Sequence, residues 1–149
     1  MVAWSIVLSA TDLCTRRIPT PLVWWCAAGL VISALAGGPP VMVRAAVGAS
    51  VLSGLLRLVR GLGVRSRDGA GTAIGGGDIR LGVTLGLFVG WSASSFVGAV
   101  VDPLLVAGLA SFLALFVVAF RVLVTGWGSW REPLAFGSWL CLAALVIGI

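Results

Sequence analysis

Long apolar segments separated by short polar stretches dominate this chain of 149 residues. A helix needs about 20 consecutive apolar residues to cross a bilayer, and several segments approach or reach that length. A further apolar run, residues 79–101, is interrupted by the sequence GWSASS. Turn-forming residues such as GGPP at 37–40 separate the segments. The pattern predicts membrane helices over 21–36, 41–62, 79–101, 103–124 and 133–149.

A shorter apolar run, MVAWSIVLSAT, precedes Asp12 at the N-terminus. Its 11 residues form about 16 Å of helix, around half of the hydrocarbon core. Counting it gives an all-α, polytopic membrane protein of about six helices in one domain, residues 1–149. We expect the native N-terminus to lie further upstream, and an intact mass starting at Met1 would contradict this. No positive charge precedes the run, so a signal peptide is not favoured.

The composition supports a lipid-facing exterior. Hydrophobic residues make up 60% of the chain and charged residues 10%, against about 25% charged in an average soluble domain. A soluble protein of this size could not cover its surface with so few polar groups. Lipid, in contrast, solvates an apolar exterior.

The arginines predict the orientation, because positive charge accumulates in cytoplasmic loops. In a bundle of six alternating helices, the loops after the first, third and fifth helices share one side. Nine of the ten basic residues lie in or beside those loops, and only Arg44 lies near the opposite face. The nine are Arg16, Arg17, Arg57, Arg60, Arg65, Arg67, Arg80, Arg121 and Arg131. These loops are therefore expected in the cytoplasm, with both termini outside.

The net charge of +5 thus reflects topology and contact with anionic lipid. No basic segment carries interleaved aromatic residues, so nucleic-acid binding is not expected.

The residue types that are missing limit the chemistry. The chain has no His, Lys, Tyr, Asn or Gln, which excludes Ser-His-Asp, Cys-His and Ser-Lys nucleophilic systems. Cys14, Cys26 and Cys141 form no C-x-x-C pair, so the usual four-ligand zinc sites are excluded and no metal or cofactor is expected. The acids Asp12, Asp68, Asp78, Asp102 and Glu132 are almost the only acid-base groups.

Two of these acids, Asp12 and Asp78, can each be explained by a structural role or by a functional one. Asp12 at the end of the first helix either pairs with Arg16 one turn on or serves a function at the membrane edge. Asp78 follows three glycines and either caps the next helix or faces a substrate backbone that the glycines allow to approach. The glycine segment matches no phosphate-binding pattern.

The other acids favour structural roles. Asp102 precedes Pro103, the pattern of a helix N-cap followed by proline at the first helical position. Asp68 lies among arginines in a polar stretch and is expected to be solvated. Glu132 precedes Pro133 and is expected to cap the last helix, with a weaker supporting role on the cytoplasmic side.

Asp12 and Asp78 are expected at the same cytoplasmic level on different helices. Two neighbouring carboxylates do not both ionise easily, because like charge raises the pKa of one of them. One can then act as a base on water while the other acts as an acid, as in aspartic proteases, without His, Lys or metal.

At these residues the chain resembles the type IV prepilin peptidases. The segment DLCTRRIP, residues 12–19, resembles their first aspartate motif, and GGGDIRLGVTLGLFVGW, residues 75–91, is similar to their GxGD segment. REPLAFGSWLCLAAL, residues 131–145, is similar to their closing helix. The resemblance implies a GxGD-type aspartyl protease fold that removes the leader of prepilins. It makes Asp12 and Asp78 the catalytic pair, with Gly75, Gly77, Arg80 and Pro19 in supporting positions.

The resemblance also implies the setting. Larger family members carry an insertion with paired cysteines, associated with methylation, whereas only a short loop follows the first helix here. The chain is therefore similar to the peptidase-only forms of tight-adherence pilus systems and archaeal preflagellin peptidases. The implied partners are a prepilin or pseudopilin helix, membrane lipid and pilus or secretion machinery. The implied location is the bacterial cytoplasmic membrane, with the active site facing the cytoplasm.

Two other functions use the same features. The chain could be a non-catalytic scaffold of a pilus or secretion assembly, which predicts that Asp12→Asn and Asp78→Asn leave function unchanged. It could also be a small proton-coupled transporter using Asp78, since intramembrane acids often relay protons; this predicts uptake or conductance in liposomes.

Overall fold

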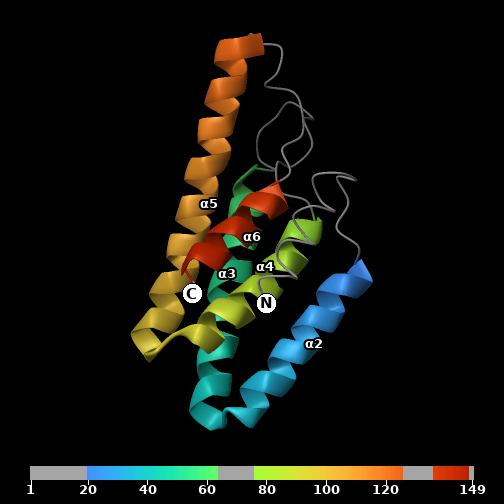
Figure 1. The fold of residues 1–149 in the computed structure, drawn as a ribbon, viewed down its shortest axis with the longest axis vertical. Helices are drawn as coiled ribbons and strands as arrows, with labels where there is room; N and C mark the ends of the chain where they lie inside the picture. Colours follow the sequence, from blue (N-terminus) through green and yellow to red (C-terminus); the bar gives the residue numbers. More distant parts are fainter. Residues whose placement is uncertain (1–19, 64–75, 126–135, 148–149) are drawn as a thin grey trace.

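The computed structural model describes residues 20–63, 76–125 and 136–147, which fold into five α-helices and contain no strand. Figure 1 shows them as a bundle in which each helix runs roughly opposite to the one before it. The helices are α2 (Thr20–Ala36), α3 (Pro39–Gly63), α4 (Gly76–Ser92), α5 (Phe96–Thr125) and α6 (Phe136–Ile147). The all-α class is confirmed. The N-terminal run expected to form the first helix lies outside the described residues, so the count of six helices stays a prediction.

The turn between α2 and α3 forms where GGPP predicts it. Gly37 N–H donates to Ser33 O over 3.1 Å, and Gly38 has a φ of +88°. A left-handed residue just past a helix end is a common C-terminal stop, and glycine adopts it without steric cost. Because α2 and α3 begin and end within two residues of the predicted limits, the local signals account for this hairpin.

The start of α5 corrects the prediction for Asp102. The helix begins at Phe96, so Asp102 is its seventh residue and does not cap its start. The cap is Ser95, whose Oγ accepts a hydrogen bond from Gly98 N–H over 3.0 Å. Pro103 is buried inside α5, where it has no N–H to donate to Ala99 O. The Ser95 cap and the burial of Ala99, Pro103 and Val106 along one face of α5 outweigh the local Asp-Pro signal.

Close packing of α3 against α4 forms the centre of the bundle. Gly82, Gly86 and Gly90 recur every four residues along α4 and face α3. A Cβ added at Gly86 would lie 2.5 Å from Gly48 O and 2.7 Å from Ala49 Cα. Glycine at this spacing lets two helix backbones approach to a distance that any side chain would prevent.

The apolar core surrounds this contact. Helix α4 contacts each of the other four described helices, so it is the central element of the described bundle. The largest side chains that are fully buried come from four of these helices, and they are Leu52, Leu81, Val89, Pro103, Val106, Leu140 and Cys141.

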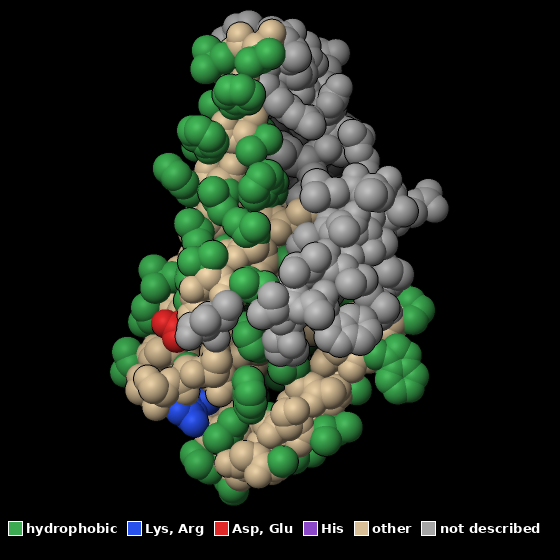
Figure 2. Space-filling view, viewed as in Figure 1, with side chains coloured by type: hydrophobic (Ala, Val, Ile, Leu, Met, Phe, Trp, Pro, Cys, Tyr) green, Lys and Arg blue, Asp and Glu red, His purple; other side chains and the backbone are tan. Residues whose placement is uncertain are grey.

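The surface of the described helices also carries many large apolar side chains. Helix α5 exposes large side chains along its length, including Phe112 (66% exposed), Phe116, Phe120 and Leu123 (84% exposed), and Figure 2 shows apolar atoms along this helix. By length and composition, 39–61 and 96–124 could each cross a membrane, and α2 and α6 contain shorter apolar helices. A patch of this extent is unfavourable in water. These features indicate membrane association.

Candidate active site

One end of the bundle gathers the C-termini of α3 and α5 and the N-termini of α2, α4 and α6 (Figure 1). Arg57 and Arg60 lie in the last two turns of α3, and Arg80 lies in the second turn of α4. Arg44 lies near the start of α3, at the other end. Within the described residues, the arginines are therefore distributed between the two ends as the sequence predicts. We call the end with Arg57, Arg60 and Arg80 the arginine-rich end.

Asp78 lies at the arginine-rich end, in the first turn of α4. It is the third helical residue and is partly buried. Negative charge is favourable here, because the first backbone N–H groups of a helix lack partners within it and carry partial positive charge. Helix α4 begins at Gly76, three residues before the start predicted at 79, so Asp78 lies inside the first turn and not at the N-cap position that one interpretation gave it.

The register of α4 decides which way Asp78 points. Residues three and four apart share a helix face, and the buried positions of α4 include Leu81, Gly82, Leu85 and Gly86. Asp78 extends this face by one turn towards the N-terminus. The glycines that seat α4 against α3 thus place the carboxylate at the inner side of the bundle, near its end.

The glycines before Asp78 leave little side-chain bulk beside it. Gly77 is exposed, and a Cβ added there would meet no atom of the described residues within 4 Å. A Cβ added at Gly76 would lie 3.6 Å from Arg60 Nη1. A peptide backbone could therefore approach α4 on the Gly77 side, whereas the Gly76 side faces a guanidinium group.

Arg60 is the residue at this site that sequence reasoning missed, since it entered only the orientation argument. Arg60 lies in the last turn of α3, and the structure brings its guanidinium beside Gly76 of the GxGD segment. The signal available in the sequence was the expectation that α3 ends and α4 begins at the same membrane level. Helix spacing alone gave no means of deciding which arginine faces the glycines.

Arg80 occupies the outer side of the same turn. Its side chain is exposed, and its carbonyl oxygen accepts a hydrogen bond from Thr84 Oγ1 over 3.4 Å. Because it lies two positions after Asp78, it projects away from the buried face. The Arg80 side chain is therefore directed to the surface of the described bundle and not to its core.

The remaining predicted site residues, Asp12, Pro19 and Gly75, lie outside the described residues, as do Asp68 and Glu132. The pairing of Asp12 with Asp78 accordingly stays a prediction. Among the described residues, no group of three or more His, Cys, Asp or Glu side chains could hold a metal ion.

Comparison with family models gives a match to the type IV leader peptidase family over residues 1–120. The matched range contains both aspartate segments and all of α2, α3 and α4, and it covers more than half of the chain. The chain belongs to this family. The predicted resemblance to prepilin peptidases is thereby confirmed. Membership of this family makes the chain a peptidase, and peptidases are hydrolases. Neither the curated proteins nor the solved structures gave a match.

Proposed function

We propose that this chain is a multi-pass intramembrane aspartic endopeptidase that removes the leader peptide of prepilin-like proteins at the cytoplasmic face of the membrane. The observation that carries the proposal is Asp78, a partly buried carboxylate in the first turn of α4 within a chain of the leader peptidase family. Asp12 is the proposed second carboxylate, and its segment falls inside the family match.

The chemistry needs only these two side chains and water. The pair holds one proton, because two adjacent carboxylates do not ionise together. The ionised carboxylate takes a proton from water as the water oxygen attacks the scissile carbonyl carbon. The protonated carboxylate donates its proton to the substrate, and cleavage of the C–N bond releases a new carboxyl end and a new amine. Each turnover consumes one water and leaves the pair with one proton again.

The surroundings of Asp78 suit an extended substrate. A peptide bond inside a helix or behind bulky side chains is inaccessible to a carboxylate, whereas Gly77 is exposed and has open space beside it among the described residues. The substrate class follows from the membrane setting and the family. A prepilin has a basic leader that stays in the cytoplasm and an apolar helix that enters the bilayer, so its cleavage site meets the membrane where Asp78 is proposed to lie.

The side of cleavage rests on the arginines. Arg57, Arg60 and Arg80 lie at the arginine-rich end with Asp78, and loops rich in arginine remain in the cytoplasm. Membrane crossing by α3 and α5 is supported by their length and apolar composition.

The test is co-expression with candidate prepilins, with loss of the leader followed by gel mobility and mass spectrometry. Asp78→Asn and Asp12→Asn each keep the size of the side chain and remove its acid-base function. We expect each to lower the cleavage rate at least about a hundredfold, with unchanged amounts of protein in the membrane.

Asp102→Asn is the matched control, because Asp102 is also partly buried near a helix start but lies at the other end of the bundle. It should cleave at the wild-type rate. Normal cleavage by both Asp78→Asn and Asp12→Asn would overturn the proposal and favour a scaffold.

A further inference from the structure

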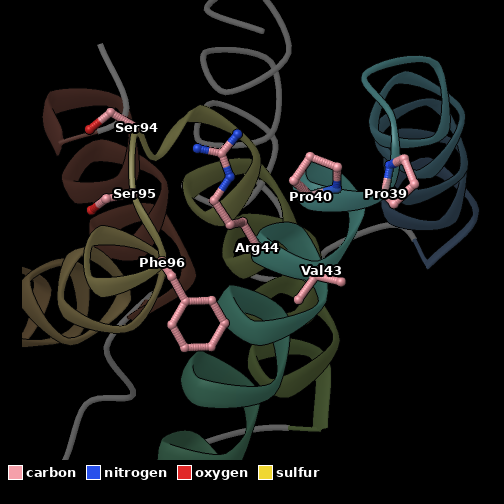
Figure 3. Close-up of a pocket in the computed structure, with 7 residues that line it drawn as sticks. All are labelled: Pro39, Pro40, Val43, Arg44, Ser94, Ser95 and Phe96. Carbon is pink, nitrogen blue, oxygen red and sulfur yellow. The ribbon is translucent and has the colours of Figure 1, made fainter.

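The end of the bundle opposite Asp78 contains a hollow of about 530 Å³ between the start of α3 and the start of α5. This volume is within the range of small-molecule pockets. Most of its lining is apolar, with one charged side chain. The lining residues are Pro39, Pro40, Val43, Arg44, Ser94, Ser95 and Phe96, and Figure 3 shows the Arg44 guanidinium between the Ser94 segment and the prolines.

Arg44 has one structural contact here and further donors to offer. Its Nη1 donates a hydrogen bond to Ala93 O over 2.6 Å, which satisfies a carbonyl just past the end of α4. A guanidinium has five N–H donors and stays charged. Its Nε is buried and finds no acceptor among the described residues. The contact with Ala93 fixes the group in the wall of the hollow without neutralising it.

No acid within the described residues neutralises Arg44. Asp102 is the other charged side chain described at this end, but it does not line the hollow and makes no ion pair with Arg44. Its Oδ2 lies over Gly98, 3.2 Å from where a Cβ would stand. The hollow is therefore a half-buried positive site inside an apolar wall.

The start of α5 adds neutral donors to the same hollow. Phe96 and Val97 are its first two residues, and N–H groups at these positions have no acceptor within a helix. Ser94 and Ser95 also line the hollow, with their hydroxyls directed away from the guanidinium in Figure 3. The start of α3 contributes less, because Pro39 and Pro40 have no N–H and the next two N–H groups already bond to Gly38 O.

We propose that this hollow binds the phosphate headgroup of an anionic membrane lipid, with Arg44 as the main contact. The inference assumes that α3 and α5 cross the bilayer, which puts their shared end at headgroup level. A phosphate with an attached acyl chain matches the lining better than a free phosphate does. The apolar side chains of Val43 and Phe96, 52% and 58% exposed, continue from the cation onto the lipid-facing surface of the bundle.

The test is native mass spectrometry of the detergent-purified chain with phosphatidylglycerol and with phosphatidylcholine. The wild-type chain should retain phosphatidylglycerol in preference. Arg44→Gln removes the cation, and Ser94→Glu adds a negative charge at the rim of the hollow while leaving both partners of the Arg44–Ala93 hydrogen bond in place. Each should weaken phosphatidylglycerol binding about fivefold or more. Thermal unfolding of the variants identifies any that fold poorly, and Ser94→Glu keeps the test valid if Arg44→Gln is one of them.

Ala36→Glu is the matched control, because Ala36 is exposed at the same end and does not line the hollow. It should stay within about twofold of wild type, since an exposed charge is screened. Equal loss of phosphatidylglycerol binding in Ser94→Glu and Ala36→Glu would show that binding depends on general surface charge, which would overturn the proposal. Binding of inorganic phosphate that depends on Arg44, with no retention of phosphatidylglycerol, would also overturn it by making the ligand a soluble anion.

Discussion

Asp78 and Asp102 share a residue type and a burial class but differ in their surroundings. Both are partly buried, and each lies within the first seven residues of a helix. A capping role was open for Asp78 and predicted for Asp102, yet α4 begins two residues before Asp78 and α5 begins six residues before Asp102. Capping in α5 is performed by Ser95.

What differs is the space beside each acid. Asp78 follows an exposed glycine with no described atom near an added Cβ, and it lies at the arginine-rich end. Asp102 lies over Gly98 and is followed by the buried Pro103. An aspartate in a membrane helix is therefore not evidence of function by itself. Among the described residues, the two acids differ in the open space beside Gly77 and in the end of the bundle at which they lie.

The largest effect should come from the contact that holds α4 in register, because both ends of the bundle depend on it. Gly86→Ala would place a methyl group against the backbone of Gly48 and Ala49. Overpacking of this kind should lower the free energy of unfolding by about 3 kcal/mol. Thermal unfolding in detergent measures the change.

Gly54→Ala is the control for this variant, since Gly54 is an exposed glycine of α3 with no described atom within 4 Å of an added Cβ. It should change stability by no more than about 1 kcal/mol. Equal stability of the two variants would show that the α3–α4 contact does not fix α4.

A smaller effect, on activity alone, should follow from added bulk beside Asp78. Gly77→Ala meets no described atom within 4 Å, so stability should hold. If the substrate backbone passes Gly77, the misplacement should lower the leader cleavage rate about tenfold or more. Initial rates on a purified prepilin measure this effect.

Gly61→Ala is the control, because it tests whether a methyl group added to any exposed glycine at the arginine-rich end lowers the cleavage rate. Gly61 is exposed near the end of α3 and also has open space beside it among the described residues. Its variant should cleave at the wild-type rate. Unimpaired cleavage by Gly77→Ala would remove the distinction drawn between the surroundings of Asp78 and Asp102.

The smallest effect should occur at the Asp102 end. Ser95→Ala removes the hydroxyl that accepts from Gly98 N–H and should lower stability by about 1 kcal/mol. Ser94→Ala, one residue earlier, removes an exposed hydroxyl and should stay within about 0.5 kcal/mol of wild type. Matched losses in both would show that the Ser95 hydroxyl does not cap α5. Thermal unfolding of both variants measures the losses.

Sequence reasoning located the helices well where the local signals agreed. The limits of α2 and α3 fall within two residues of prediction, because GGPP combines a left-handed glycine with prolines that cannot continue a helix. It misplaced the start of α5 because Asp-Pro at 102–103 is as good a local start as Ser95. The observed start is distinguished by the Ser95 cap and by the burial of Ala99, one turn before Pro103.

The candidate site divides in the same way. The GxGD segment and the placement of Asp78 at a helix start could be predicted, since a glycine run followed by an acid and an apolar run is a local pattern. The position of Arg60 beside Gly76 could not, because it depends on how α3 and α4 pack around Gly48 and Gly86. The Arg44 hollow, between segments fifty residues apart in the chain, was also beyond reach.

The sequence by itself determined an all-helical, membrane-associated chain of the leader peptidase family, with few acids and with all its arginines but Arg44 expected at one end. Length, hydropathy and residue type are properties of short segments, so they can be read without knowing which segments pack together. The tertiary structure decided which face of α4 is inward, which residue caps α5 and which arginine lies beside Gly76. These outcomes depend on the contact between two helix backbones, where the absence of a Cβ at Gly86 sets the distance.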